Sequence, residues 1–271
     1  MGRKKKVGVI GCGAIGSGVA RFIDQELKDK LELVGICDRT STKVNSLLAV
    51  LSQKPKIFND YCELIKEAEL IVETASIDCA RDVITEGVKR NKDLVILSVG
   101  AFVKYKNLYT LLKDYKGNLY IPSGAICGVD GLGSLKRAHI KELVLTTSKP
   151  PGSLGEISFL EEEGIDTFSL RREQILFQGS IEEAIERFPQ NINVAATIFL
   201  ATQFPNASVV VKVDPHLRRN SHKIELKGEE ANIKIEVENV PSLSNPKTSY
   251  LAILSVQSLL EKITSNIKIG S

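Results

Sequence analysis

Three glycines near the N-terminus are the first residues whose spacing suggests chemistry. Gly11, Gly13 and Gly16 follow a short apolar run in the segment VGVIGCGAIGSG. In this spacing the first glycine makes a tight turn, the second lets the backbone approach a pyrophosphate, and the third lets a helix pack closely on a strand. Backbone N–H groups at the start of the next helix, at Ala14 and Ile15, would then face the phosphates. The pattern predicts a dinucleotide-binding turn.

An acidic residue follows these glycines at a suitable distance. Asp38 lies 22 residues beyond Gly16, at the end of the next apolar run. A carboxylate there can accept hydrogen bonds from both ribose hydroxyls and would repel a 2′-phosphate, which favours NAD. The guanidinium of Arg39 could instead turn toward a 2′-phosphate. The predicted cofactor is therefore NAD or NADP.

The chain has three histidines, and a neutral imidazole can accept a proton near pH 7. His139 and His216 lie in predicted connections between elements. His222 shares a predicted strand face with Ile224 and Leu226, so its ring should point into the protein. A histidine on an apolar face is often a core residue, so the residues alone leave a catalytic and a structural interpretation open.

The elements that would position these residues alternate through the first part of the chain. Apolar runs without polar alternation, typical of strands buried on both faces, are separated by helical patterns. Strands are predicted at 7–10, 31–37, near 57, at 70–73, 94–97 and 119–122, and helices at 17–27, 42–51, 61–68, 80–90 and 106–114. This alternation predicts an α/β fold with a doubly wound parallel sheet, the Rossmann architecture.

The loops at the carboxyl ends of the strands are where such sheets bind ligands. The loop after 70–73 contains the small residues Ala75 and Ser76, and the loop after 94–97 is also built of small residues. Small side chains leave room for a flat nicotinamide ring. Ordinary tight turns have the same composition, so both interpretations stay open.

The pattern changes after residue 121. Strands predicted at 142–147, 209–213, 223–227 and 232–238 resemble an antiparallel meander, interrupted by helices at 180–187 and 194–202. We therefore predict a dinucleotide-binding Rossmann domain over residues 1–121. Residues 122–242 should form a second, α+β domain on an open mixed or antiparallel sheet, which would bind substrate and mediate dimerisation. The terminal segment 243–271, with a helix at 250–263, should pack back on the first domain.

Composition argues against several classes of protein. The 36 Lys and Arg against 33 Asp and Glu give a net charge of +3, which is too small to indicate a nucleic-acid partner. The five cysteines contain no CxxC pair, so we expect a reducing cytoplasm and no metal site. Neither a signal peptide nor a spanning helix is recognisable, so no membrane partner is expected. The open sheet face makes a homodimer the expected assembly.

Four further segments, in this order behind the glycine turn, resemble the L-aspartate dehydrogenase family. They are IPSGAICGVDGL (121–132), LTTSKPPG (145–152), FPQNINVAAT (188–197) and RNSHKIELKG (219–228). The resemblance implies oxidation of L-aspartate with NAD or NADP to iminoaspartate. That product can feed NAD biosynthesis or hydrolyse to oxaloacetate and ammonia.

The resemblance also implies roles for three residues. His222 matches the histidine that is catalytic in the family, and Asn193 matches an asparagine that contacts the nicotinamide amide. Ala125 corresponds to a backbone contact with the dinucleotide. For Asn193, capping of the helix that follows is a good alternative, because asparagine is among the best helix N-caps.

A substrate with two carboxylates needs cationic or N–H partners. Lys149 stands just past a predicted strand and before the stiff Pro150-Pro151 pair, and we predict that it binds a substrate carboxylate. Asn220 lies two residues before His222 and so on the same strand face. Its amide could donate to a carboxylate, or the residue could belong to a plain turn.

Two alternatives to an aspartate dehydrogenase remain open. Homoserine dehydrogenase and dihydrodipicolinate reductase also combine a Rossmann domain with an open-sheet domain, so they fit the architecture equally well. A non-catalytic regulator that senses the dinucleotide would share the glycine turn. Such a sensor has no need for an inward His222 or for a basic pocket of carboxylate size.

Overall fold

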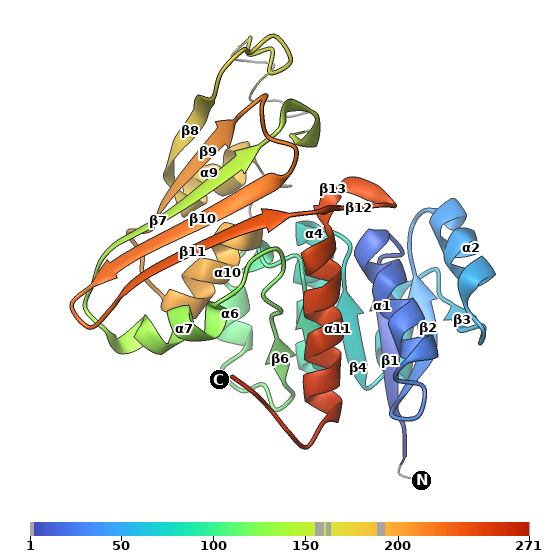
Figure 1. Cartoon of the computed structure of the whole chain (residues 1–271). Helices are drawn as coiled ribbons and strands as arrows, with labels where there is room; N and C mark the ends of the chain where they lie inside the picture. The colour runs from blue at the N-terminus through green and yellow to red at the C-terminus, as the bar shows by residue number, and fades with distance from the viewer. Residues whose placement is uncertain (1–2, 155–159, 161–163, 189–192, 271) are drawn as a thin grey trace. The chain divides into compact units, whose positions relative to one another are not determined.

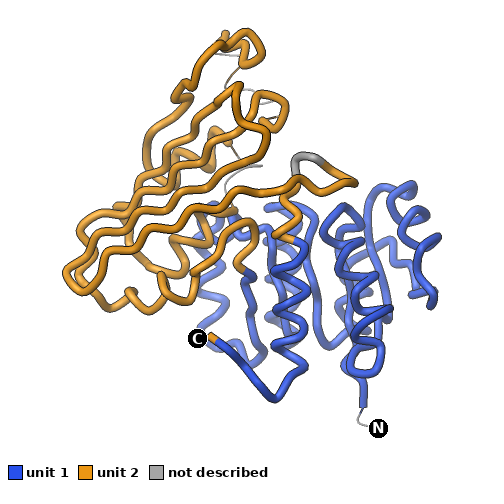
Figure 2. Tube along the Cα trace, in the orientation of Figure 1, with its two compact units in different colours: residues 1–122, 253–269 blue, residues 123–252, 270–271 orange. Residues whose placement is uncertain are grey.

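The computed structural model describes residues 3–154, 160, 164–188 and 193–270. Contacts within the chain divide it into two compact units (Figure 2). The first comprises Met1–Pro122 and Ile253–Ile269, and the second comprises Ser123–Ala252 and Gly270–Ser271. One unit contains a parallel sheet and the other a mixed sheet with helices, so the predicted fold class is confirmed.

The first unit is built on a six-stranded sheet in the order β3-β2-β1-β4-β5-β6 (Figure 1). All neighbouring strands in it run parallel. The strand order reverses between β1 and β4, and dinucleotides bind beside such a reversal at the carboxyl edge of the sheet. The strands are β1 (Lys5–Ile10), β2 (Leu31–Cys37), β3 (Lys56–Ile57), β4 (Leu70–Glu73), β5 (Asp93–Ile96) and β6 (Leu119–Tyr120).

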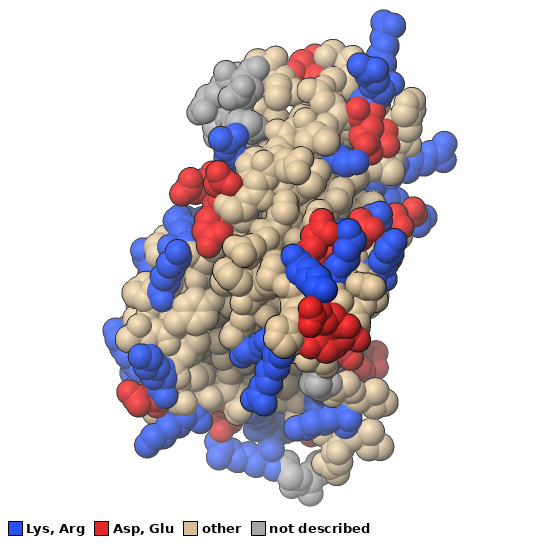
Figure 3. All heavy atoms as spheres, turned by 90° about the vertical axis from the view of Figure 1, so that its left-hand side faces the viewer, with Lys and Arg blue, Asp and Glu red and all other residues tan. Residues whose placement is uncertain are grey.

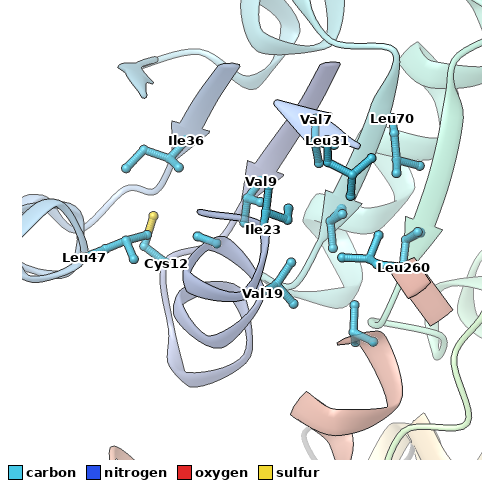
Figure 4. Packing of buried hydrophobic residues seen from close by; sticks show 14 of the residues in the cluster. Val7, Val9, Cys12, Val19, Ile23, Leu31, Ile36, Leu47, Leu70 and Leu260 are labelled. Carbon is cyan, nitrogen blue, oxygen red and sulfur yellow. The ribbon is translucent and has the colours of Figure 1, made fainter. Parts of the chain in front are cut away.

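Helices cover both faces of this sheet. On one face, α1 (Ala14–Gln25), α2 (Ser41–Val50) and the part of α11 (Tyr250–Thr264) from Ile253 onward share one apolar cluster with the strands. On the other, α3 (Tyr61–Glu67) packs on β1 and β2, and α4 (Ile77–Lys89) on β4 and β5. Figure 4 shows Val19 and Ile23 of α1 close to Val9 of β1, and Leu47 of α2 beside Cys12. Burying each such side chain contributes about 1.5–3 kcal/mol.

The helix predicted at 106–114 is shorter than expected, because α6 covers only Leu108–Leu111. A separate short helix, α5 (Ala101–Lys104), precedes it. Only Leu108 is buried in α6, so the segment has no continuous apolar stripe that would sustain a longer helix against the sheet.

The second unit is built on a five-stranded sheet in the order β11-β10-β7-β9-β8. Helices α9 (Ile181–Arg187) and α10 (Asn193–Thr202) cover one face, and none of the described helices covers the other (Figure 1). A short helix α7 (Val129–Ser134) packs on α10, and β12 (Pro241–Ser242) pairs with β13 (Asn245–Ser249). The strands of the main sheet are β7 (Ile140–Lys149), β8 (Gln174–Ser180), β9 (Ser208–Val213), β10 (Asn220–Gly228) and β11 (Asn232–Asn239).

The expectation of an antiparallel meander is wrong for one pair of strands, because β7 and β9 run parallel. Parallel neighbours need a long crossover connection, and here the chain between them contains β8 and both helices. The sequence patterns also missed β8. Its pairing with β9 shifts register between Ile175 and Phe177, and this irregularity breaks the alternation by which strands are recognised.

Candidate active site

The glycine turn of the first unit has the geometry that a dinucleotide needs. Gly11 has a φ of +94°, a conformation that other residues rarely adopt. A Cβ atom on Gly16 would lie 1.8 Å from the carbonyl oxygen of Gly11. A Cβ on Gly13 would meet nothing within 4 Å. Glycine is thus required at Gly11 and Gly16 by the turn itself, and Gly13 faces open space on the side where such turns bind a pyrophosphate.

Helix α1 begins directly after this turn, with Gly13 as its N-cap and no side-chain cap. The first N–H groups of a helix, here those of Ala14 and Ile15, have no acceptor within the helix. No acidic residue lies in the first turn of α1. The helix start therefore offers N–H donors and a partial positive charge to an anion such as a pyrophosphate.

Asp38 follows β2 at the carboxyl edge of the sheet. Its Oδ2 accepts a hydrogen bond of 2.7 Å from the Cys12 N–H, and its Oδ1 accepts one of 2.8 Å from the Thr40 N–H. These bonds fix the carboxylate beside the glycine turn, and each oxygen keeps a lone pair that can accept a ribose hydroxyl. Arg39 next to it is exposed.

Thr74, in the loop after β4, was missed by the sequence patterns. Its Oγ1 donates to the Gly11 carbonyl oxygen at 2.9 Å and lies 3.1 Å from the Ile10 carbonyl oxygen. The Thr74 side chain thus ties the glycine turn to the neighbouring strand. A lone threonine in a loop of small residues gives no signal of such a role.

Ala75 and Ser76 are exposed in the same loop. Their N–H groups donate to Glu73 Oε1 at 2.7 and 3.1 Å. Ser76 also caps α4, because its Oγ accepts a hydrogen bond of 3.3 Å from the Cys79 N–H. Since these N–H groups already have an acceptor, the loop would contact a cofactor through other atoms.

His222 lies on the covered face of the second sheet, as the alternation predicted. It is 5% exposed, and Ile224 and Leu226 on the same face are also buried. Thr147, its cross-strand neighbour on β7, has Oγ1 3.0 Å from His222 Nδ1. If Nδ1–H donates to this oxygen, Nε2 is the basic nitrogen of the ring. The sequence did not single out Thr147.

Lys149 and Asn220 lie on the same face as His222. Lys149 is the last residue of β7, rather than just past the strand as predicted, and is 5% exposed. Asn220 is 6% exposed. The register pairs Ser221 with Ser148, and continuing it by one residue would place Asn220 beside Lys149. In the described part of the chain, Asn220 Oδ1 is the one buried side-chain nitrogen or oxygen atom without a hydrogen-bond partner. This oxygen can accept a hydrogen bond from a ligand.

Burial lowers the pKa values of His222 and Lys149 and so determines which of them is charged at pH 7. Burial, and then the charge of Lys149, lowers the pKa of His222 to about 3. Burial lowers the pKa of Lys149 to about 8. At pH 7 the imidazole is therefore neutral and the amine still carries its charge. A buried cation beside a neutral imidazole suits an anionic ligand that gives up a proton.

Two more residues that the sequence predicted for the site, Ala125 and Asn193, accept hydrogen bonds through their backbone carbonyl groups. The Ala125 carbonyl oxygen accepts a hydrogen bond of 3.0 Å from Asn239 Nδ2. Asn193 is the first residue of α10, and its carbonyl oxygen accepts from Thr197 Oγ1 at 2.8 Å. The four residues before Asn193 lie outside the described residues, so the capping alternative stays a prediction. His139 and His216 are exposed.

Within the described ranges, no group of three or more His, Cys, Asp or Glu side chains could hold a metal ion. None of the described helices has the length and apolar character needed to cross a membrane.

Two family models match the chain and together span most of it. The C-terminal model of aspartate dehydrogenase matches residues 130–263. The model for the NAD-binding domain of homoserine dehydrogenase matches residues 11–122. The second match covers only the dinucleotide-binding unit, so it does not distinguish between substrates.

Full-length relatives give a more specific result. The L-aspartate dehydrogenase of Methanosarcina mazei is 41% identical over 270 residues, which are 98% of this chain and 99% of the relative. That of Methanococcus maripaludis is 37% identical over 274 residues, with the same coverage of 98% and 99%. The crystal structure of aspartate dehydrogenase from Thermotoga maritima has a TM-score of 0.77 at 27% identity, covering 99% of this chain and 100% of that one. A myo-inositol dehydrogenase from Lactobacillus casei has a TM-score of 0.60 at 10% identity, covers 97% of this chain and 86% of its own, and shows a shared fold only.

Proposed function

Because the chain belongs to the L-aspartate dehydrogenase family, we propose that it oxidises L-aspartate with NAD or NADP. The family predicted from the sequence segments is thus confirmed. The observation that carries the proposed activity is the buried pair of a neutral His222 and a cationic Lys149, which lies within the part of the chain that matches the aspartate dehydrogenase model. The products would be iminoaspartate, then oxaloacetate and ammonia after hydrolysis. A role in NAD biosynthesis stays a prediction.

The first unit would hold the coenzyme. Its pyrophosphate would lie on the open space at Gly13 and the start of α1, and its adenosine ribose on Asp38. When bound, the nicotinamide accepts the hydride that leaves the substrate α-carbon. The remaining proposed contacts to the coenzyme are Gly11, Ala14, Ile15, Gly16, Arg39, Ala75, Ser76, Ala125 and Asn193.

Coenzyme choice would depend on Asp38, whose carboxylate is fixed by two N–H groups and presents its remaining lone pairs to a ribose. Asp38→Ala should weaken NAD binding far more than NADP binding, because the carboxylate binds the 2′-hydroxyl and repels a 2′-phosphate. Titration of both coenzymes against wild type and variant measures this. An unchanged ratio of the two dissociation constants would refute the ribose role.

His222 would accept a proton from the substrate ammonium while the hydride leaves the α-carbon, so that a C=N bond forms. Once it has released that proton, the same imidazole could take one from the water that attacks this bond. Its low pKa suits the free enzyme, in which the ring must be neutral. A carboxylate bound to Lys149 would offset one cause of that low pKa and so make His222 a stronger base.

Lys149 would bind one carboxylate of the substrate through its buried ammonium. Asn220, which the continued register would place beside it, has an unsatisfied buried oxygen. That oxygen suits an N–H donor, such as the substrate ammonium, better than it suits a carboxylate. We therefore assign Asn220 to the amino end of the substrate, and replacement by Ala should raise the KM for L-aspartate.

The test of the proposed function is reduction of NAD or NADP, followed by near-ultraviolet absorbance, with a panel of amino and hydroxy acids. We expect turnover with L-aspartate alone among the common amino acids. Turnover with homoserine, or reduction of dihydrodipicolinate by the reduced coenzyme, would instead indicate one of the related oxidoreductases. Coenzyme binding without turnover of any substrate would indicate a sensor.

We also propose a cytoplasmic homodimer, with L-aspartate rather than a membrane or nucleic acid as the other partner. All five cysteines are free thiols, which is typical of a reducing compartment. The open face of the second sheet carries Val144 and Thr146 of β7 beside Val210 of β9. Figure 3 shows a broad uncharged area bordered by acidic and basic side chains. Sedimentation velocity should give the mass of two chains, and a monomer would overturn the proposed dimer.

A further inference from the structure

Glu73, the last residue of β4, is a buried acid for which the proposed mechanism has no use. It is 0% exposed. Its Oε1 accepts hydrogen bonds from the N–H groups of Ala75 and Ser76 and, at 2.9 Å, from the Ser98 hydroxyl. Its Oε2 accepts one of 3.1 Å from the Ser98 N–H. The carboxylate thus joins the loops that follow β4 and β5.

These hydrogen-bond partners bear on the protonation state of the Glu73 side chain. Three of the four are backbone N–H groups, which can only donate, and the fourth is a hydroxyl, which can donate or accept. Burial raises the pKa of Glu73, and the four hydrogen bonds oppose that rise by favouring the ionised form. Within the described part of the chain, no Lys, Arg or His forms an ion pair with Glu73. With the side chain ionised, as three backbone N–H donors favour, its charge would be balanced by dipoles that include the start of α4.

The position of this charge relates it to the coenzyme. Glu73 pairs with Ile10, the residue just before the glycine turn, across β4 and β1. Asp38 would bind the adenosine side of the dinucleotide at the end of β2, so the nicotinamide would extend toward the ends of β4 and β5. Those ends carry the two loops that Glu73 joins.

We propose that the carboxylate of Glu73 makes the coenzyme site favour the oxidised nicotinamide ring, which is cationic, over the reduced ring, which is neutral. This inference rests on the proposed coenzyme site. Its physical basis is the attraction between a buried, unpaired negative charge and a positive ring in surroundings of low dielectric constant. Such an attraction would help an enzyme that works in the direction of aspartate oxidation to bind the right form of its coenzyme.

The test measures binding rather than turnover. Dissociation constants of NAD⁺, NADH and ADP-ribose are determined by calorimetry for wild type and for Glu73→Gln, which keeps the shape of the side chain and removes its charge. The variant should bind NAD⁺ about fivefold more weakly relative to NADH, with ADP-ribose affinity unchanged because that ligand has no ring. Ser98→Ala is the matched control. It removes one hydrogen bond to the same carboxylate, keeps the charge, and should preserve the wild-type ratio.

A measurement on the wild-type protein covers the case in which Glu73→Gln does not fold, which loss of ADP-ribose binding would reveal. The NAD analogue with a neutral benzamide ring in place of the pyridinium ring should bind about fivefold more weakly than NAD⁺. Equal affinity for the two, or an unchanged ratio of NAD⁺ to NADH affinity in Glu73→Gln, would overturn the inference. Failure of wild type to bind any of these ligands would instead overturn the proposed coenzyme site itself.

Discussion

At the scale of single residues, the proposed chemistry depends on His222 and on Thr147, whose hydroxyl oxygen lies 3.0 Å from its ring. His222→Ala should lower kcat by about 10²- to 10⁴-fold, the usual contribution of a general base. Coenzyme affinity should stay near wild type, because the ring serves only the substrate. Steady-state kinetics and coenzyme titration measure the two effects separately.

Two further variants test whether the loss of kcat is specific to the His222 ring and its orientation. Thr147→Val removes the oxygen 3.0 Å from Nδ1 and should cause a smaller loss of kcat, since the ring remains but is no longer held in one tautomer. His139→Ala, at an exposed position, should change neither quantity. If His222→Ala lost coenzyme affinity and kcat to the same extent, the ring would be structural.

Lys149 gives a prediction about pH. Burial lowers its pKa to about 8, so the amine loses its charge as the pH rises through that value. The kcat/KM for L-aspartate should therefore fall above about pH 8, because an uncharged amine binds a carboxylate poorly. Lys149→Arg should carry this alkaline limit to higher pH, since a guanidinium keeps its proton.

The control for the pH experiment is Lys223→Arg, a substitution at a partly exposed lysine on the open face of the same sheet. It should leave the pH profile as it is in wild type. An alkaline limit that stays in place in Lys149→Arg would show that Lys149 does not bind the substrate.

The residue types in the site were more predictable than their partners. The alternation of β10 predicted that His222 points inward, and the glycine spacing predicted where the turn lies. Thr147 was not predicted, because it meets His222 across a strand pair whose members are 75 residues apart in the chain. In the sequence, Glu73 is recognisable only as the last residue of a buried strand. Its proposed role depends on Ser98, which lies 25 residues later in the chain.

At the scale of elements, the turn between β1 and α1 makes two different demands on glycine. Gly16→Ala should destabilise the fold by more than about 3 kcal/mol, because its Cβ would lie 1.8 Å from the Gly11 carbonyl oxygen and the turn must open. Gly13→Ala meets nothing within 4 Å and should change stability by about 1 kcal/mol at most.

Coenzyme affinity should reveal an effect of Gly13→Ala that its stability does not. Gly13→Ala should fold normally yet bind the coenzyme at least about tenfold more weakly, because its methyl group occupies the space for the pyrophosphate. Urea denaturation and coenzyme titration of the two variants test this. Unchanged coenzyme affinity in Gly13→Ala would place the pyrophosphate elsewhere.

Elements with a regular apolar pattern were predicted well, and irregular ones were not. The ranges predicted for β2 and β4 are the observed ones, since both strands are nearly continuous apolar runs. β8 was missed because of its register shift, and the parallel pairing of β7 with β9 was missed because pairing partners are not encoded locally. Propensity and periodicity describe single segments, whereas sheet order depends on tertiary packing.

At the scale of the whole molecule, the chain folds as two units, and its last helix joins the first. Val256 and Leu260 of α11 belong to the same apolar cluster as α1 and β1, which are about 240 residues earlier in the chain. The sequence pattern predicted a terminal amphipathic helix, and its apolar residues indicated that it must be covered. The architecture could be predicted at this scale because it follows from the order of strands and helices, whereas the substrate followed from family segments.

The central claim is that hydride passes from the α-carbon of L-aspartate to the coenzyme. The most direct test uses L-aspartate that carries deuterium at the α-carbon, with mass spectrometry of the reduced coenzyme. We predict one deuterium at C4 of the nicotinamide and a rate no faster than that with unlabelled substrate. Reduced coenzyme without deuterium, or deuterium released to water, would contradict the account.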